Sequence, residues 1–188
     1  MKLTLVYGLM FAGKSSYCAK KYPDYTFYVP SFTDRGYFSR DKSIDDPSSV
    51  VKFQTFLPKL HDKMVIDEGQ FLNDVDLDSI INCNEDIHVV VACLNSKGYV
   101  RGNHYTWRVS SELLAHATEI VHLQSTCSIA GCNGAGIMHI DVSCGGEYIG
   151  DQGYRVMCHR CLSAMRVDEK ERVNNYLSKL IWKDEFSQ

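Results

Sequence analysis

An eight-residue loop, Gly8-Leu9-Met10-Phe11-Ala12-Gly13-Lys14-Ser15, constrains the fold of this chain more than any other segment. It matches the pattern G-x-x-x-x-G-K-[ST] in full, between an apolar stretch (residues 2–7) and a helix-like stretch (residues 14–21). Glycines let such a loop curl until successive N–H groups point at one anion, and the following helix adds its positive N-terminus. The segment therefore predicts a strand, a phosphate-binding loop and a helix in succession.

A second motif, Met64-Val65-Ile66-Asp67-Glu68, is an apolar stretch that ends in two carboxylates. In nucleotide-binding proteins such a strand brings its first acid to Mg²⁺. We predict that Lys14 bridges the β- and γ-phosphates of ATP, and that Ser15 and Asp67 hold Mg²⁺, directly or through water. Glu68 is placed one residue further, free to take a proton from an acceptor hydroxyl, and is the predicted catalytic base.

The remaining apolar runs alternate with helical spacing. The segment 87–94 is nearly continuous apolar, which is typical of a strand buried on both faces. Further strands are predicted at residues 2–7, 26–29, 50–54, 63–67 and 119–123, and helices at residues 14–21, 110–117 and 168–184. The predicted fold is α/β, a P-loop NTPase-like parallel sheet with helices. The polar, non-periodic residues 31–49 are predicted to form a loop.

Composition excludes several classes of protein. The 188 residues are 45% hydrophobic and 23% charged, as in ordinary globular proteins. A net charge of -3 leaves no basic excess for nucleic acid. No apolar run approaches the roughly 18 residues of a membrane span, and the apolar start is too short for a signal peptide. We expect a cytoplasmic protein with no membrane or nucleic-acid partner.

Four of the eight cysteines form two pairs, Cys127-x₄-Cys132 and Cys158-x₂-Cys161. Two thiolate pairs on adjacent turns can close a tetrahedral Zn²⁺ site, and four thiolates leave no open position on the metal. The predicted zinc is therefore structural. Free thiols or disulfides are the alternative, although disulfides do not suit a cytosolic chain.

The other cysteines have separate interpretations. Cys144, which lies between the pairs, or His159 could replace one zinc ligand. Cys18, Cys83 and Cys93 fall in helix or strand patterns and are predicted to be buried small hydrophobes.

Several segments resemble the cellular-type (type II) thymidine kinase family, in the same order along nearly the whole chain. Asp67-Glu68-Gly69-Gln70-Phe71 resembles its Asp-Glu-x-Gln-Phe signature, and residues 8–15 are similar to its P-loop. Asp34-Arg35 resembles its Asp-Arg segment near the phosphates. Leu94 with Tyr99-Val100-Arg101 resembles its Leu-Asp-Gly-x-Phe-Gln-Arg stretch, and Ile149-Gly150 with Tyr154 resembles its lasso segment Ile-Gly-Gly…Tyr.

The resemblance implies transfer of the ATP γ-phosphate to the 5′-hydroxyl of thymidine, giving dTMP. The implied cofactor-binding residues outside the loop are Asp34, Arg35, Asp67, Gly69 and Gln70. The implied substrate-binding residues are Met10, Tyr99, Tyr148, Ile149, Gly150 and Tyr154.

Gly and Cys residues become frequent from about residue 126, which indicates a domain boundary there, and the resemblance implies the role of each part and an assembly. Residues 1–125 would form the nucleotide-binding α/β domain, and residues 126–188 a small β-rich subdomain with a C-terminal helix. In that subdomain zinc would tie a lasso over the nucleoside. A homotetramer and feedback by thymidine triphosphate are further implications.

Two other functions remain open from the residues alone. One is a different P-loop small-molecule kinase or ATPase. The other is a zinc-containing nucleic-acid-binding module with a vestigial P-loop, against which the acidic pI of about 6.1 and the intact Lys14, Ser15, Asp67 and Glu68 argue.

Overall fold

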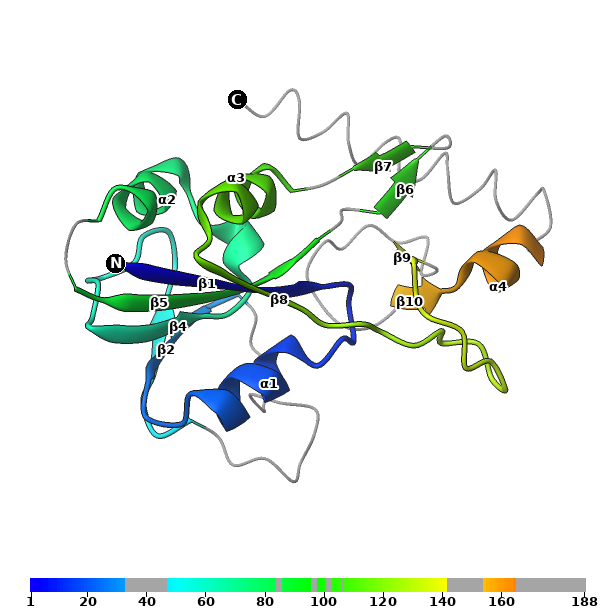
Figure 1. The fold of residues 1–188 in the computed structure, drawn as a ribbon, viewed down its shortest axis with the longest axis horizontal. Coiled ribbons are helices and arrows are strands. Elements are labelled where there is room, and N and C mark those ends of the chain that lie inside the picture. Colours follow the sequence, from blue (N-terminus) through cyan, green and yellow to red (C-terminus); the bar gives the residue numbers. More distant parts are fainter. Residues whose placement is uncertain are drawn as a thin grey trace. The chain divides into compact units, whose positions relative to one another are not determined.

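The computed structural model describes residues 1–32, 47–83, 86–95, 98–100, 103–105, 107–141 and 154–164 (Figure 1). The chain forms two compact units. The first contains Met1–Gly8, Gly13–Asn95 and Trp107–Leu123, and the second contains Leu9–Ala12, Ser96–Thr106 and Gln124–Gln188. The predicted domain division at residues 125 and 126 stays a prediction. No helix among the described residues combines the length and apolar character needed to cross a membrane.

The first unit is built on a six-stranded sheet in the order β3-β2-β4-β5-β1-β8, in which every neighbouring pair is parallel. This confirms the predicted parallel α/β fold. The strands are β1 (Lys2–Gly8), β2 (Thr26–Pro30), β3 (Val50–Phe53), β4 (Lys63–Ile66), β5 (His88–Leu94) and β8 (Glu119–His122). Each lies within a residue or two of its predicted range.

Helices cover both faces of this sheet, with α2 (Asp74–Ile81) and α3 (Arg108–His116) on one side and α1 (Lys14–Lys21) on the other (Figure 1). Because side chains alternate along a strand, each central strand feeds two cores. On β5, Val89, Val91 and Cys93 pack in the core under α2 and α3, whereas Val90 and Ala92 pack in the core under α1. All five are fully buried, which confirms the prediction of a strand covered on both faces.

Helix α2 and the short 3₁₀ turn η1 (Gly69–Phe71) before it were not predicted. Asn73 is the N-terminal cap of α2, and its side-chain oxygen accepts a hydrogen bond from the Asp76 N–H at 2.9 Å. An Asn cap followed by acidic residues in the first turn is a start signal that the sequence carries. The helix has only eight residues, so its periodicity alone is a weak signal.

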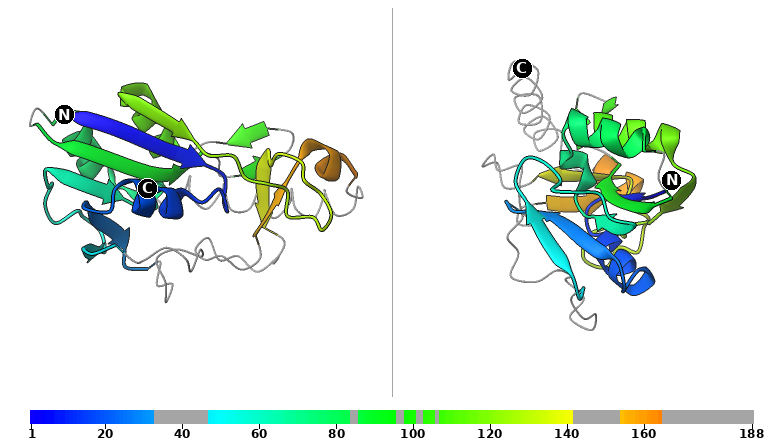
Figure 2. Two further views of the ribbon diagram at one scale, coloured as in Figure 1. Left: turned by 60° about the horizontal axis from the view of Figure 1, so that its bottom comes forward. Right: turned by 90° about the vertical axis from the view of Figure 1, so that its left-hand side faces the viewer.

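Two antiparallel pairs of strands lie in the described part of the second unit. Strands β9 (Met138–Asp141) and β10 (Tyr154–Met157) form one, and β6 (Gly98–Val100) and β7 (Asn103–Tyr105) form the other. Figure 2 shows β9 and β10 in yellow and orange, with helix α4 (His159–Ala164) following β10 directly. The predicted helix at residues 168–184 lies outside the described residues.

Parallel pairing brings the functional motifs of the first unit to one edge of its sheet. β1 pairs with β5 so that Gly8 is opposite Leu94, and β4 pairs with β5 so that Ile66 is opposite Val91. The phosphate loop leaves β1 at Gly8, and Asp67 follows β4 directly. Both motifs therefore leave the sheet at the carboxyl ends of its strands, where α/β proteins bind ligands.

Candidate functional site

The phosphate loop changes direction through two residues with left-handed backbone, Phe11 (φ 61°) and Gly13 (φ 78°). Glycine adopts this conformation without a steric penalty, which explains the second glycine of the motif. Gly13 is also the N-terminal cap of α1 and has no side chain that could bond to the first turn. The N-terminus of such a helix carries partial positive charge, which favours a bound anion.

Lys14, Ser15 and Asp67 meet beside this loop. The Lys14 ammonium donates a hydrogen bond to the Gly8 carbonyl at 3.3 Å. The Ser15 hydroxyl donates to the Asp67 Oδ2 atom at 2.8 Å. Asp67 is only 5% exposed, and its backbone N–H donates to the Tyr28 carbonyl of the neighbouring strand at 2.9 Å. The hydroxyl of one motif and the carboxylate of the other are thus in direct contact.

These two oxygens fit the requirements of Mg²⁺. Adjacent ligands of an octahedral Mg²⁺ lie about 2.9 Å apart, given Mg–O distances of about 2.05 Å. The Ser15 and Asp67 oxygens are 2.8 Å apart. The pair can therefore occupy two neighbouring coordination positions without a change in its spacing.

Glu68 has an unusual backbone for a residue with a side chain, φ 54° and ψ 41°. This conformation costs roughly 1–3 kcal/mol in a non-glycine residue, and such strain is concentrated at functional sites. It is held in place locally, because the Glu68 N–H donates to Asp67 Oδ1 at 3.1 Å. Its carboxylate is also held, since the Gln70 amide donates to Glu68 Oε2 at 2.6 Å.

Gly69 and Gln70 attach this segment to β5. A Cβ atom on Gly69 would overlap the Val91 Cγ1 atom, so close packing requires glycine there. Gln70 is 3% exposed, and its Oε1 atom accepts a hydrogen bond from the Leu94 N–H at 3.1 Å. Gln70 was predicted from the resemblance to bind the cofactor. Its described hydrogen bonds are with Glu68 and Leu94.

Two cysteines of the first unit are buried, as predicted. Burial raises the pKa of the Cys18 thiol well above its usual value, and it raises the pKa of Cys93 to about 11. Thiols in this state are protonated and unreactive. Cys83 differs from the prediction, because it is half-buried and lies after the end of α2.

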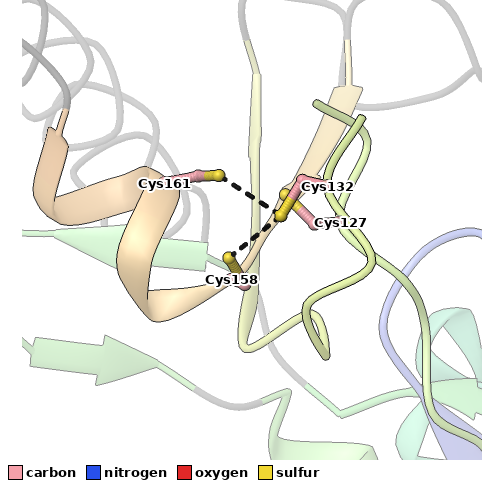
Figure 3. Close-up of side chains that lie close together, drawn as sticks. All are labelled: Cys127, Cys132, Cys158 and Cys161. Atoms are coloured by element: carbon pink, nitrogen blue, oxygen red, sulfur yellow. Dashed lines mark hydrogen bonds between the residues drawn. The ribbon is translucent and has the colours of Figure 1, made fainter. Parts of the chain in front are cut away.

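The four cysteines predicted as zinc ligands lie together in the second unit (Figure 3). Their sulfur atoms all lie within 4.8 Å of one another. Cys132 Sγ is 3.7 Å from Cys158 Sγ and 3.5 Å from Cys161 Sγ. Four thiolates around Zn²⁺ lie about 3.8 Å apart, given Zn–S distances of about 2.3 Å. The donor set and its spacing are therefore compatible with a closed zinc site.

Two glycines, Gly131 and Gly134, flank Cys132, and Gly134 approaches the cysteine cluster closely. Gly131 has a left-handed backbone (φ 73°). A Cβ atom on Gly134 would lie 2.8 Å from Cys158 Sγ and 3.5 Å from Cys132 Sγ, so a side chain there would crowd the sulfurs. Gly134 therefore leaves room for the sulfurs of Cys132 and Cys158.

Hydrogen bonds from the protein favour negative charge on Cys132. The Gly134 backbone N–H and the Arg160 guanidinium both donate to Cys132 Sγ, which lowers the pKa of this thiol to about 6. The hydrogen bond that Cys161 makes to Cys132 raises the pKa of Cys161 to about 12. Sequence reasoning did not identify Gly134 or Arg160. Both residues lie within two positions of a paired cysteine in the sequence, and this was the signal that could have identified them.

The residues expected near the nucleoside are only partly described. In the second unit, the Ser125 hydroxyl donates to the Met10 carbonyl at 2.9 Å, and this fixes the middle of the phosphate loop. Tyr99 lies on β6 and Tyr154 begins β10, and only their backbones are described. The predicted residues outside the described part of the chain are Asp34, Arg35, Cys144, Tyr148, Ile149 and Gly150.

A comparison with models of known families finds a match over most of the chain. The family model for thymidine kinase matches residues 1–162 of this chain. The matched range contains the phosphate loop, the Asp67-Glu68 segment and all four clustered cysteines. A search of curated proteins returned no match.

Proposed function

The chain belongs to the thymidine kinase family, and on this premise we propose that it transfers the γ-phosphate of ATP to the 5′-hydroxyl of thymidine, giving dTMP. Family membership supports phosphorylation of thymidine in general. The contact between Ser15 and Asp67, with Glu68 directly beside it, carries the finer proposal. This arrangement supports the proposal, because phosphoryl transfer from a nucleoside triphosphate uses metal-holding oxygens and a base beside the phosphates.

The nucleotide would lie along the phosphate loop. Backbone N–H groups of residues 10–15 and the Lys14 ammonium would bind the β- and γ-phosphates, and Ser15 and Asp67 would hold Mg²⁺. The metal supplies positive charge that neutralises the phosphate oxygens during transfer. Lys14 would leave the Gly8 carbonyl when phosphate is present, because that hydrogen bond is long at 3.3 Å. Gly69 and the Asp34-Arg35 segment are proposed to complete this side of the site.

Glu68 would act as the general base. Its carboxylate would accept the proton of the attacking hydroxyl, while the enzyme holds that oxygen in line with the γ-phosphorus. The left-handed backbone of Glu68 and the bond from Gln70 support this role, because both restrict where the carboxylate can lie. The adjacent Asp67 is occupied by Ser15 and is not free for the same task.

Zinc is proposed to hold the second unit together through Cys127, Cys132, Cys158 and Cys161. Closed thiolate sites of this kind stabilise a fold and do not react with substrates. The residues proposed to bind thymidine are Met10, Tyr99, Tyr148, Ile149, Gly150 and Tyr154. A cytoplasmic homotetramer is proposed from the resemblance alone.

The deciding experiment is phosphorylation of thymidine by the purified chain with labelled ATP and Mg²⁺. Deoxycytidine serves as the control acceptor. We expect labelled dTMP, and a wild-type protein that labels no thymidine would refute the function.

The Glu68→Gln variant tests the base, since it keeps the shape of the side chain and removes its ability to accept a proton. It should lose roughly 10²- to 10⁴-fold in kcat. ATP binding should be retained, because the phosphate loop is unchanged. Near-normal turnover would exclude Glu68 as the base.

A further inference from the structure

The buried amide of Gln70 has only one orientation that satisfies its surroundings. The backbone N–H of Leu94 can only donate, so the amide oxygen must face it, at 3.1 Å. The amide nitrogen then necessarily faces Glu68, where it donates to Oε2 at 2.6 Å. Since Gln70 is 3% exposed, water does not compete freely for either bond. Gln70 therefore connects the Glu68 carboxylate to the end of β5.

The end of β5 is itself held from two sides. The Leu94 carbonyl accepts a hydrogen bond from the Ser110 hydroxyl of α3 at 2.7 Å, and Ser110 is buried. Leu94 also pairs with Gly8, where the phosphate loop begins. A continuous series of contacts thus runs from the start of the phosphate loop through Leu94 and Gln70 to the Glu68 carboxylate.

A glutamate side chain has three rotatable bonds, and a carboxylate that no partner holds samples several of their combinations. A general base must stay within hydrogen-bond reach of the hydroxyl that it deprotonates, and misplacement by about 1 Å can cost 10²-fold in rate. We infer that Gln70 is a positioning residue, which holds the Glu68 carboxylate at a fixed distance from the phosphate loop through Leu94. This inference rests on the proposed role of Glu68 as the base.

The first test compares two replacements of similar size. In Gln70→Glu, one carboxylate oxygen still accepts from Leu94, but the other cannot donate to Glu68. In Gln70→Met, both hydrogen bonds are lost. Both variants should lower kcat for thymidine by about 10²-fold. The KM for ATP should stay near the wild-type value, because Lys14 and Ser15 are untouched. A rise in the KM for ATP with unchanged kcat would overturn the inference and assign Gln70 to nucleotide binding.

The second test asks whether Gln70 acts through Glu68. Groups that act as a unit have strongly non-additive effects. In a Glu68→Gln background, adding Gln70→Met should therefore cause little further loss of residual turnover. A further loss as large as that in the wild-type background would overturn the inference, because Gln70 would then act independently of Glu68.

The third test needs no turnover, so it separates this inference from the proposed function. Gln70→Glu places two carboxylates against each other and should lower the melting temperature by roughly 5 °C. Combining it with Glu68→Gln exchanges donor and acceptor and restores a hydrogen bond. Most of the lost melting temperature should return in the double variant, even if thymidine proves not to be the substrate. No recovery would show that the two side chains are not bonded in solution, and would refute the inference.

Discussion

Gly69→Ala tests how tightly the segment that carries Glu68 is packed against the sheet. The added methyl group would overlap the Val91 Cγ1 atom and come within 3.4 Å of the Ala92 carbonyl oxygen. Val91 is fully buried on β5 and β-branched, so it has no open space to rotate into. Either Val91 or the turn η1 has to move.

The expected cost follows from the volume of one methyl group. Forcing an extra methyl into a packed core costs about 1–3 kcal/mol of unfolding free energy. Val91→Ala alone removes two methyl groups, worth about 1.6 kcal/mol of transfer free energy, and leaves a cavity that brings the loss to about 2–3 kcal/mol. In the double variant, the new methyl of residue 69 fills the space left by Cγ1. The double variant should cost about 2–3 kcal/mol, and not the sum of about 3–6 kcal/mol.

Urea unfolding of the wild type, the two single variants and the double variant measures this coupling. Val90→Ala is the matched control, because Val90 is an equally buried neighbour on the same strand but packs in the core on the opposite face. Gly69→Ala and Val90→Ala should therefore add. Additive losses for Gly69 and Val91 would refute the packing argument. Gly69→Ala should also lower kcat for thymidine, since a shifted η1 displaces Glu68.

Further predictions concern the metal and the pH dependence of stability. Freshly purified protein should contain about one Zn²⁺ per chain by metal analysis; its absence would refute the zinc proposal. Gly134→Ala, whose Cβ would lie 2.8 Å from Cys158 Sγ, should weaken zinc binding by roughly 10-fold or more in competition with a chromophoric chelator. An unchanged affinity for Zn²⁺ would contradict this prediction, because it would show that the chain around Gly134 can move to accommodate the methyl group. Burial, with Lys2 nearby, lowers the pKa of His88 below its ordinary 6.5. As pH falls, the imidazole of His88 therefore becomes protonated in the unfolded chain at a higher pH than in the folded protein. The free energy of unfolding is then unaffected by His88 above about pH 6.5, and it decreases as pH falls from about 6.5 towards the lower pKa of the folded state. His88→Gln should flatten this decline in urea unfolding at pH 7.5 and 5.5, and an unchanged pH slope would contradict the assignment.

Short segments of the sequence are enough to predict the phosphate loop, the buried central strand and the cysteine cluster of this protein. The phosphate loop needs its glycines and lysine at fixed spacing, and Gly13 takes the left-handed backbone that the motif implies. The uninterrupted apolar run of β5 is buried on both faces, and the four paired cysteines converge. The phosphate loop and β5 depend on residues that are close in sequence, and closely spaced cysteine pairs have few roles other than metal binding or disulfide formation. The sequence alone therefore predicts these features.

The tertiary structure decided which distant groups meet. The strand order places β5 between the two motif strands, and only that order makes Leu94 the anchor for Gln70. No periodicity in the sequence distinguishes a glutamine that binds a ligand from one that holds a neighbouring glutamate. The sequence likewise does not show that the Arg160 guanidinium donates a hydrogen bond to Cys132 Sγ. Sequence determines the local conformations and the reactive groups, whereas the positions of their partners follow from packing between segments that are far apart in the chain.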